Sequence, residues 1–246
     1  HQHYAVCTYK KKKKGSVQMG NMGDALVEEL NVETVFTIPI FGGIPISESV
    51  LVTWIIMAAL LLLSLWLTHG LKTQNITKRQ AFAEFVVTKL NGMVENMIGE
   101  EGKKYVPYLT TVLVYIGFAN LIGYFGMKPP TKDVNVTAAL AIMSIILIEA
   151  AGIRAKGLKG WGKSFAQPIA IVAPLNVLEI IIRPLSLCMR LFGNVLGAFV
   201  IMKLIENILP AVLPIPFSLY FDLFDGLIQA YVFVFLTSLF IKEAIE

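Results

Sequence analysis

Charged residues and cysteines are both scarce in this sequence. Asp, Glu, Lys and Arg together make up 15% of the 246 residues, whereas hydrophobic residues make up 56%. Soluble domains usually carry about 25% charged residues. An ordinary water-soluble protein is therefore excluded, because it would lack the polar groups to cover its surface. The two cysteines, Cys7 and Cys188, are too few for a disulfide framework.

The sequence also lacks the motifs of catalysis and of cofactor binding. Its three histidines form no cluster with cysteines or carboxylates at metal-ligand spacing, and it contains neither a glycine-rich phosphate loop nor a nucleophile motif. We therefore expect no catalytic residue, no metal site and no cofactor in this chain.

The sequence contains several long uncharged runs. Residues 51–67, 105–127 and 134–148 contain no charge, and Asp222 and Asp225 are the only charges between 207 and 241. About 20 apolar residues suffice for a helix to cross the hydrocarbon core of a bilayer. The pattern predicts an all-α polytopic membrane protein with about five to six membrane helices. We expect a polar N-terminal tail at 1–48 and a membrane domain at 49–246, with spans near 50–68, 105–127, 134–153, 170–208 and 217–242 and an amphipathic helix at 80–99.

Basic residues concentrate in two connections, which sets the expected orientation. The connection at 69–89 and the loop at 154–163 are both basic, so both are expected to face the cytoplasm. With an odd number of crossings, the N-terminus is then outside and the C-terminus cytoplasmic. The lysine run at 10–14 argues against this orientation, but two independent connections favour it.

One arginine, Arg190, lies deep within the apolar span at 170–208. A charge at the centre of a membrane helix costs about 2.5–3.5 kcal/mol on insertion scales, and arginine stays protonated in proteins. Arg190 is thus a fixed positive charge, which either acts in ion movement or pairs permanently with a carboxylate such as Asp222, Asp225 or Glu149. Steps of three or four residues place other polar or small residues on its helix face: Glu179, Arg183, Ser186, Asn194 and Gly197. Gly193 and Gly197 form a pair of small residues that would allow another helix to approach closely.

Polar residues in the neighbouring spans are candidates for an ion path. Asp222 and Asp225 would line a water-filled path for a cation or else lie at the outer interface, and Gln229 is expected to pair with the face of Arg190 and Asn194. Glu149 would serve an inner path or pair with Arg154. Asn120 is expected to make a hydrogen bond between helices. An ion-translocating subunit and an independent secondary cation transporter both fit, and the absence of an internal repeat favours the subunit.

Three segments resemble the subunit a family, which belongs to the membrane (Fo) sector of the F-type ATP synthase. They are PLSLCMRLFGN at 184–194, PPTKDVNVTAALA at 129–141 and PLNVLE at 174–179, and Gln229-Ala230 matches the family's glutamine. The resemblance covers about 100–246 well. It departs from the family at Phe199, where many members carry a carboxylate or histidine, and at Ile180, where a second acid is common. Seven residues before the glutamine, the family's histidine or acid corresponds to Asp222.

The resemblance implies a mechanism and a set of partners. The arginine helix would be steeply tilted, pack with the last helix as a hairpin and face the rotating ring of c subunits. Arg190 would open each ring site and separate two offset half-channels for H⁺ or Na⁺, while Gln229 lies beside it and Asn194 lines the path. The implied partners are the c-ring, the peripheral-stalk b subunits, the rest of the F-type enzyme and membrane lipid, without nucleic acid. A bacterial plasma membrane is the expected location.

Overall fold

A computed structural model describes residues 34–38, 44–70, 77–125, 127, 129–164, 173–208, 217 and 219–246. All of these residues belong to one compact unit, which spans 32–246. The tail expected at 1–48 lies mostly outside the described residues. Its last part pairs as a two-stranded antiparallel sheet, with β1 at Thr34–Ile38 and β2 at Ile44–Ser47. The alternating β-branched residues of TVFTI favour a strand, a signal hidden within an otherwise polar stretch.

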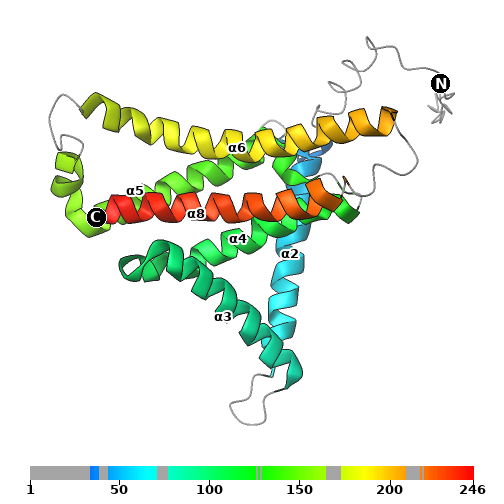
Figure 1. Ribbon diagram of the computed structural model, residues 1–246, viewed down its shortest axis with the longest axis horizontal. Coiled ribbons are helices and arrows are strands. Elements are labelled where there is room, and N and C mark those ends of the chain that lie inside the picture. Colours follow the sequence, from blue (N-terminus) through cyan, green and yellow to red (C-terminus); the bar gives the residue numbers. More distant parts are fainter. Residues whose placement is uncertain are drawn as a thin grey trace. The chain divides into compact units, whose positions relative to one another are not determined.

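Helices account for most of the rest of the described chain (Figure 1). In chain order they are α2 (Glu48–Thr68), α3 (Lys78–Ile98), η1 (Glu100–Tyr105), α4 (Val106–Leu121), η2 (Ile122–Phe125), η3 (Pro130–Lys132), α5 (Val134–Ser164), α6 (Ala173–Ile208), η5 (Leu219–Asp225) and α8 (Gly226–Ile245). Of these, η5 is a π-helix, whereas η1, η2 and η3 are 3₁₀ turns.

Four helical segments among the described residues are long and apolar enough to cross a membrane: Glu48–Thr68, Val134–Gly162, Pro174–Met202 and Leu219–Ile245. The prediction of an all-α polytopic membrane protein is confirmed. Helix α4 is shorter, at 16 residues, although η2 continues it. Leu109 and Ile116 of α4 are completely buried. Thus α4 is the most internal helix of the described unit.

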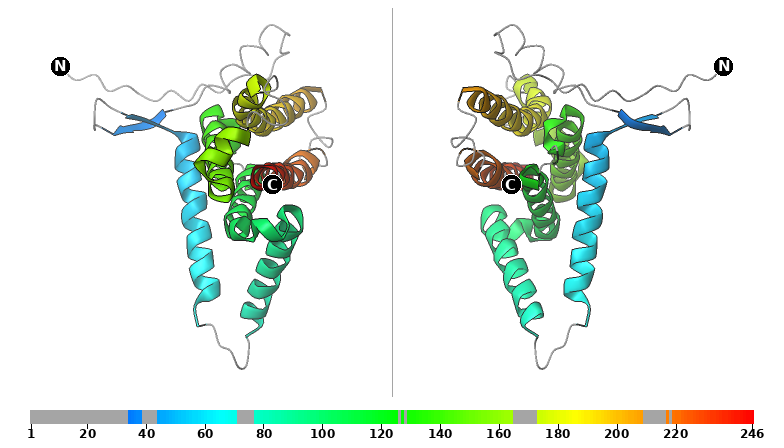
Figure 2. Two further views of the ribbon diagram at one scale, coloured as in Figure 1. Left: turned by 90° about the vertical axis from the view of Figure 1, so that its left-hand side faces the viewer. Right: turned by 90° about the vertical axis from the view of Figure 1, so that its right-hand side faces the viewer.

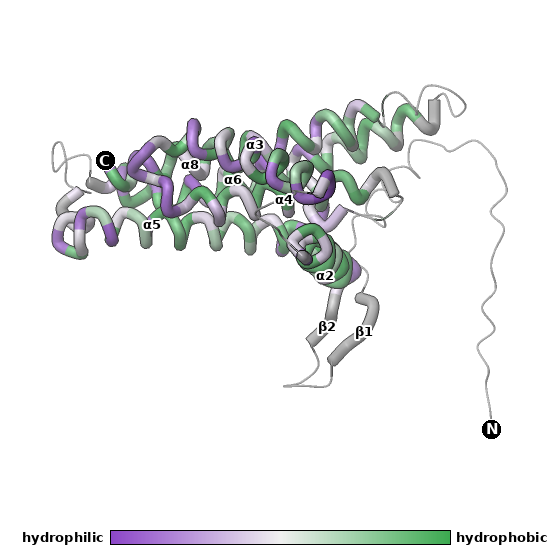
Figure 3. The backbone as a smooth tube through the Cα atoms, turned by 90° about the horizontal axis from the view of Figure 1, so that it is seen from below, coloured by the Kyte–Doolittle hydropathy of each residue, from purple (hydrophilic) through white to green (hydrophobic). Residues whose placement is uncertain are grey.

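Helix α2 stands apart from the other helices in its direction and its exposure. Ser47 caps its first turn, where the Ser47 hydroxyl accepts a hydrogen bond from the Val50 amide at 3.4 Å. Val52 and Ile56 pack against α4, whereas Leu62 and Trp66 are well exposed. Figures 1 and 2 show α2 steeply inclined to α6 and α8, and in Figure 3, where α2 is seen nearly end-on, its tube is mostly coloured as hydrophobic. An apolar helix with this little protein contact presents its surface to lipid.

Helix α5 extends further than the sequence indicates. The hydrophobic run stops near residue 153, but helical structure continues to Ser164. Gly157 interrupts it with φ 71° and ψ 163°, a conformation essentially reserved for glycine. The basic loop expected at 154–163 is therefore a kinked helical extension, which brings Trp161 back toward Glu149.

Helices α6 and α8 lie side by side and run in opposite directions, as the expected hairpin requires (Figure 1). Helix α6 is one helix of 36 residues with Pro184 inside it. Its packed side is formed by Leu187 and Leu191, which are at most 1% exposed, and Phe233 of α8 is equally buried. Helix α8 also packs against α3, α4 and α5, and the arginine helix α6 packs most extensively against α5, so both α5 and α8 join α6 to the rest of the core.

Candidate functional site

Arg190 lies midway along α6, where the packed side of the helix meets its open side. It is partly buried, next to fully buried Leu191 on one side and half-exposed Met189 on the other. Within the described part of the chain, no hydrogen bond, ion pair or ring contact involves Arg190. Neither Asp225 nor Glu149 therefore acts as its permanent partner. The side chain of Asp222 lies outside the described residues.

The open side of α6 continues above and below Arg190. Ser186 and Asn194 are exposed one turn to either side. A Cβ atom added at Gly193 or Gly197 would meet nothing within 4 Å. This strip of α6 has room for another helix to approach, as the small residues predict.

Asn194 and Gln229 join α6 to α8 beside the open side. The Asn194 side-chain amide donates a hydrogen bond to Gln229 Oε1 at 2.6 Å. Gln229 is only 3% exposed, and its Nε2 is buried with no partner in the described structure. A buried amide donor without an acceptor costs about 1–3 kcal/mol. The carbonyl oxygen of Gln229 therefore binds α6 through Asn194, whereas its nitrogen is available to donate to another polar group.

Arg183, two turns before Arg190, has permanent partners. Its Nη2 lies 2.6 Å from Glu179 Oε2 on the same helix and 2.7 Å from Glu243 Oε1 on α8. The guanidinium also lies over the ring of Phe240, 4.9 Å from the centroid. Glu179, which shares the helix face of both arginines, thus pairs with Arg183. The two arginines of α6 therefore differ: Arg183 is held by two carboxylates of this chain, whereas Arg190 has no partner among the described residues.

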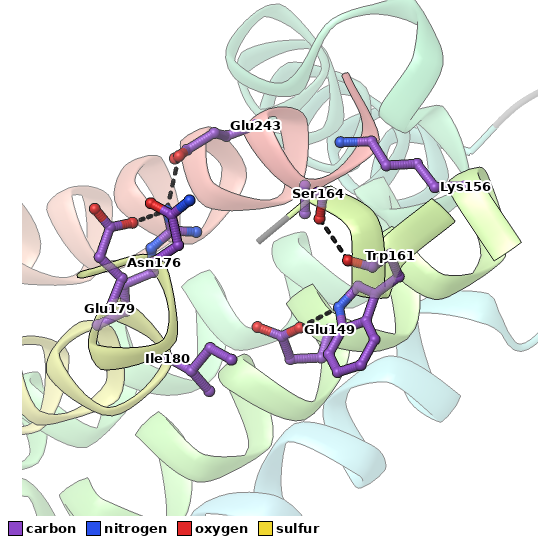
Figure 4. A pocket seen from close by; sticks show the side chains of 10 residues that line it. Glu149, Lys156, Trp161, Ser164, Asn176, Glu179, Ile180 and Glu243 are labelled. Atoms are coloured by element: carbon purple, nitrogen blue, oxygen red, sulfur yellow. Dashed lines mark hydrogen bonds and ion pairs between the residues drawn. The ribbon is translucent and has the colours of Figure 1, made fainter. Parts of the chain in front are cut away.

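A half-open pocket of about 310 Å³ lies where the ends of α5, α6 and α8 meet (Figure 4). Glu149 lies in its wall, and its Oε2 accepts a hydrogen bond from Trp161 Nε1 at 2.8 Å. The remaining lining is largely polar: Lys156, Ser164, Asn176, Glu179, Arg183 and Glu243, with Ile180 and Ala244. Glu243 was not expected here from the sequence, because it lies 60 positions after Arg183 and on another helix. Trp161 and Lys156 were not expected either, because the sequence places them in a loop and the structure places them in the extension of α5.

At the other end of α6, the position where the family often carries an acid holds Phe199. The ammonium of Lys132 lies over its ring, 3.5 Å from the centroid. Nearby, Asn120 donates to the carbonyl of Gly226, which confirms the hydrogen bond between helices expected for it. Asp225, the last residue of η5, is partly buried. Among the described residues, this end therefore combines Lys132 of the η3 turn with polar groups from α4 and the η5–α8 junction.

These features together can control the movement of a cation. A fixed positive charge without a partner in the described chain attracts a carboxylate and repels cations. Polar groups lead toward it from both ends of α6, with the pocket at one end and the Asn194–Gln229 pair toward the other.

Comparison with known proteins gives a consistent result. The family model described as ATP synthase A chain matches residues 50–242. The chain is similar to ATP synthase subunit a of Moorella thermoacetica, with 40% identity over 83% of this chain and 94% of that protein. It is 36% identical to ATP synthase subunit a 2 of a Bradyrhizobium species, over 83% of this chain and 91% of the relative. It is also 29% identical to the sodium ion specific ATP synthase subunit a of Propionigenium modestum, over 82% and 75% of the two chains.

Proposed function

The chain belongs to the ATP synthase A chain family, and from that premise we propose that Arg190 is the fixed charge that couples ion flow to rotation of the c-ring. As a family member it is the ion-conducting subunit of the membrane Fo sector of an F-type ATP synthase. It is a multi-pass membrane protein that works within that complex and is not catalytic by itself. The proposals below concern the roles of its residues, its direct partners and its orientation.

The observation that carries the proposal is that Arg190 has no partner among the described residues. A guanidinium inside the membrane domain is stable only if something compensates its charge. A carboxylate on a passing c subunit would do so, with an attraction of about 4 kcal/mol at 4 Å for an effective dielectric constant near 20. The arginine then competes with the transported cation for that carboxylate, so each ring site releases its ion as it reaches Arg190. The same charge blocks direct leakage of cations between the two sides.

The exposed side of α6 suits a ring of helices. Four large apolar residues follow one another at helical spacing and are each about half exposed: Leu178, Ile182, Leu185 and Met189. Arg190 and Ser186 border this stripe. We place the c-ring against it, which leaves α2, α3 and their lipid-facing surfaces for the peripheral-stalk b subunits.

The two ion paths are assigned to the two ends of α6. The pocket with Glu149, Glu179 and Glu243 forms the cytoplasmic half-channel, since the basic residues of the α5 extension favour that side. Asp222 and Asp225, with Asn194, line the path from the opposite side. In this orientation the N-terminus is outside, the C-terminus is cytoplasmic and the membrane is a bacterial plasma membrane. The carried ion is H⁺ or Na⁺, and no resident cofactor is needed, because the ion is the cargo.

Substitution of Arg190 tests the mechanism. In proteoliposomes that contain the whole enzyme, Arg190→Ala should abolish ATP synthesis driven by an ion gradient. Arg190→Lys should lower it strongly, because a compact ammonium lacks the planar fork of the guanidinium. Coupled synthesis at the wild-type rate in Arg190→Ala would refute the proposal. The same assay with and without sodium at fixed pH identifies the ion.

A further inference from the structure

A buried amide at the outer end of the domain joins three separate elements. Asn120 of α4 is 6% exposed, and its Nδ2 donates to the Gly226 carbonyl at 2.9 Å. Its Oδ1 accepts from the hydroxyl of Thr131, in the η3 turn, at 2.8 Å. Thr131 is completely buried. Gly226 is 106 residues from Asn120 and Thr131 is 11 residues from it, and each partner lies in a different element, so the two bonds join α4 to α8 and to the η3 turn.

The contact with Gly226 fixes the start of α8. A Cβ atom added at Gly226 would lie 2.9 Å from the Cβ of Asn120, so the two backbones approach as closely as glycine allows. Gly226 directly follows η5, whose π-helical turns are wider than those of an α-helix. The hydrogen bond from Asn120 is made to Gly226, the first residue of α8, so it holds the backbone at the transition between the two helix types. Gln229 follows three residues later, on the same side of α8.

The η3 turn also reaches α6. Lys132, the residue after Thr131, places its ammonium over the ring of Phe199. Phe199 lies five residues beyond Asn194 on α6, and Gly226 lies three residues before Gln229 on α8. The turn thus contacts α6 directly and α8 through Asn120, both on the outer side of the Asn194–Gln229 hydrogen bond.

We infer that the η3 turn is a positioning brace: Thr131, acting through Asn120, sets the register of Gln229 against Asn194 beside Arg190. Thr131 and Asn120 are both buried within this chain, so we assign them a positioning role and not a contact with the ion or the ring. Their effect on transport rests on the proposed function, since the position of the pair matters to ion transfer only if Arg190 meets the ring carboxylates. The brace itself is a statement about this chain and can be measured without transport.

The structural test measures how close the two helices are at the pair. Asn194→Cys and Gln229→Cys are introduced into the intact complex together with Cys7→Ala and Cys188→Ala, and the two thiols are joined by a short bis-methanethiosulfonate reagent. Adding Thr131→Val should slow cross-linking at least fivefold, whereas Thr131→Ser, which keeps the hydroxyl, should not. An unchanged rate in Thr131→Val would overturn the inference.

Thr237→Val is the matched control. Thr237 is 1% exposed, and its hydroxyl donates to the Phe233 carbonyl within α8 at 2.8 Å. The substitution removes the same buried hydroxyl at the same volume without touching the brace, so cross-linking should stay at its starting rate. If Thr237→Val slowed cross-linking as much as Thr131→Val, the slowing would reflect a general loss of packing, and the brace would be refuted.

The functional test asks whether Thr131 acts through Gln229. In proteoliposomes with otherwise native residues, Thr131→Val should shift the ion concentration for half-maximal ATP-driven transport severalfold, and Thr131→Ser should restore it. In a Gln229→Leu background, Thr131→Val should add no further shift, because residues that act through one contact are not additive. A full additional shift would contradict the inference.

Two further measurements keep the outcomes separate. If Thr131→Val does not assemble, Lys132→Met tests the other arm, since it keeps the aliphatic stem and removes the charge over Phe199. It should slow cross-linking in the same direction by a smaller factor, and no change would count against the brace. If Thr131→Val slowed cross-linking while Arg190→Ala still showed coupled ATP synthesis, the brace would be supported and the proposed function would be refuted.

Discussion

Gln229 and Arg190 illustrate what single residues in the membrane domain can do when their polar groups are only partly matched. Gln229 gives its carbonyl oxygen to Asn194, while its buried nitrogen has no acceptor in the described structure. Arg190 likewise has no partner there, whereas Arg183 has two carboxylates. Sequence spacing identified the shared face of Arg190, Asn194 and Glu179, but it could not show which arginine Glu179 would choose.

Removing the Gln229 amide should impair transport more than assembly. In Gln229→Leu, of similar size, the Asn194 donor loses its acceptor at a cost of about 1–3 kcal/mol. We expect ATP-driven ion pumping to fall at least tenfold with the complex still assembled. Asn194→Leu should have a similar effect, and the double variant should be little worse than either single one. Additive losses would show that the two residues act independently.

At the scale of elements, the sequence predicted the membrane helices well and their ends less well. The uncharged run at 134–148 predicts α5, but Arg154 and Lys156 mark the end of the apolar stretch and not the end of the helix. The extension forms because the helical backbone satisfies its own hydrogen bonds whether or not lipid surrounds it. Likewise, the pocket could not be foreseen, because it needs Trp161 to return past the Gly157 kink and Glu243 to reach Arg183 on another helix.

The Gly157 kink should be sensitive to a single methyl group. Its φ of 71° combined with ψ of 163° is strained for any L side chain. Gly157→Ala should therefore cost about 1–3 kcal/mol and lower the thermal inactivation midpoint of the solubilised complex. Gly162→Ala is the control. An added Cβ meets nothing within 4 Å at either position, and Gly162 lies in ordinary helix, where alanine is favoured by up to about 1 kcal/mol. Equal midpoints for the two variants would rule out backbone strain.

At the scale of the whole molecule, exposed apolar surface identifies where lipid and other subunits must cover the chain. Helix α2 exposes Leu62 and Trp66, and α6 exposes Ile182, Leu185 and Met189 around Arg190. Composition alone predicted that such surface would exist, because 56% hydrophobic residues cannot all be buried. Which helix faces lipid and which faces a partner subunit depends on packing. We assign the partner to α6 because Arg190 lies beside its exposed apolar stripe, whereas the exposed surface of α2 is apolar.

Assembly provides a prediction separate from conduction. Purification through a tag on this chain in mild detergent should recover the c-ring and the b subunits in the wild type and in Arg190→Ala alike, because one charge contributes little to the contact area. Leu185→Asp, in contrast, places a charge in the apolar stripe and should reduce the recovered c-ring severalfold while leaving the b subunits bound. Undiminished c-ring in Leu185→Asp would move the ring contact to another surface.

The half-open pocket at the inner ends of α5, α6 and α8 has an electrical consequence. In the orientation proposed above, water in this pocket would be at the potential of the cytoplasm, so the membrane voltage would not fall across the pocket. The voltage falls instead over the shorter stretch of α6 between Arg183 and the outer path, which contains Arg190. A potential of 100 mV corresponds to about 2.3 kcal/mol for each elementary charge. Under the proposed mechanism, most of that work would be delivered within a few turns of one helix, at the point where each ring carboxylate would exchange its ion for Arg190.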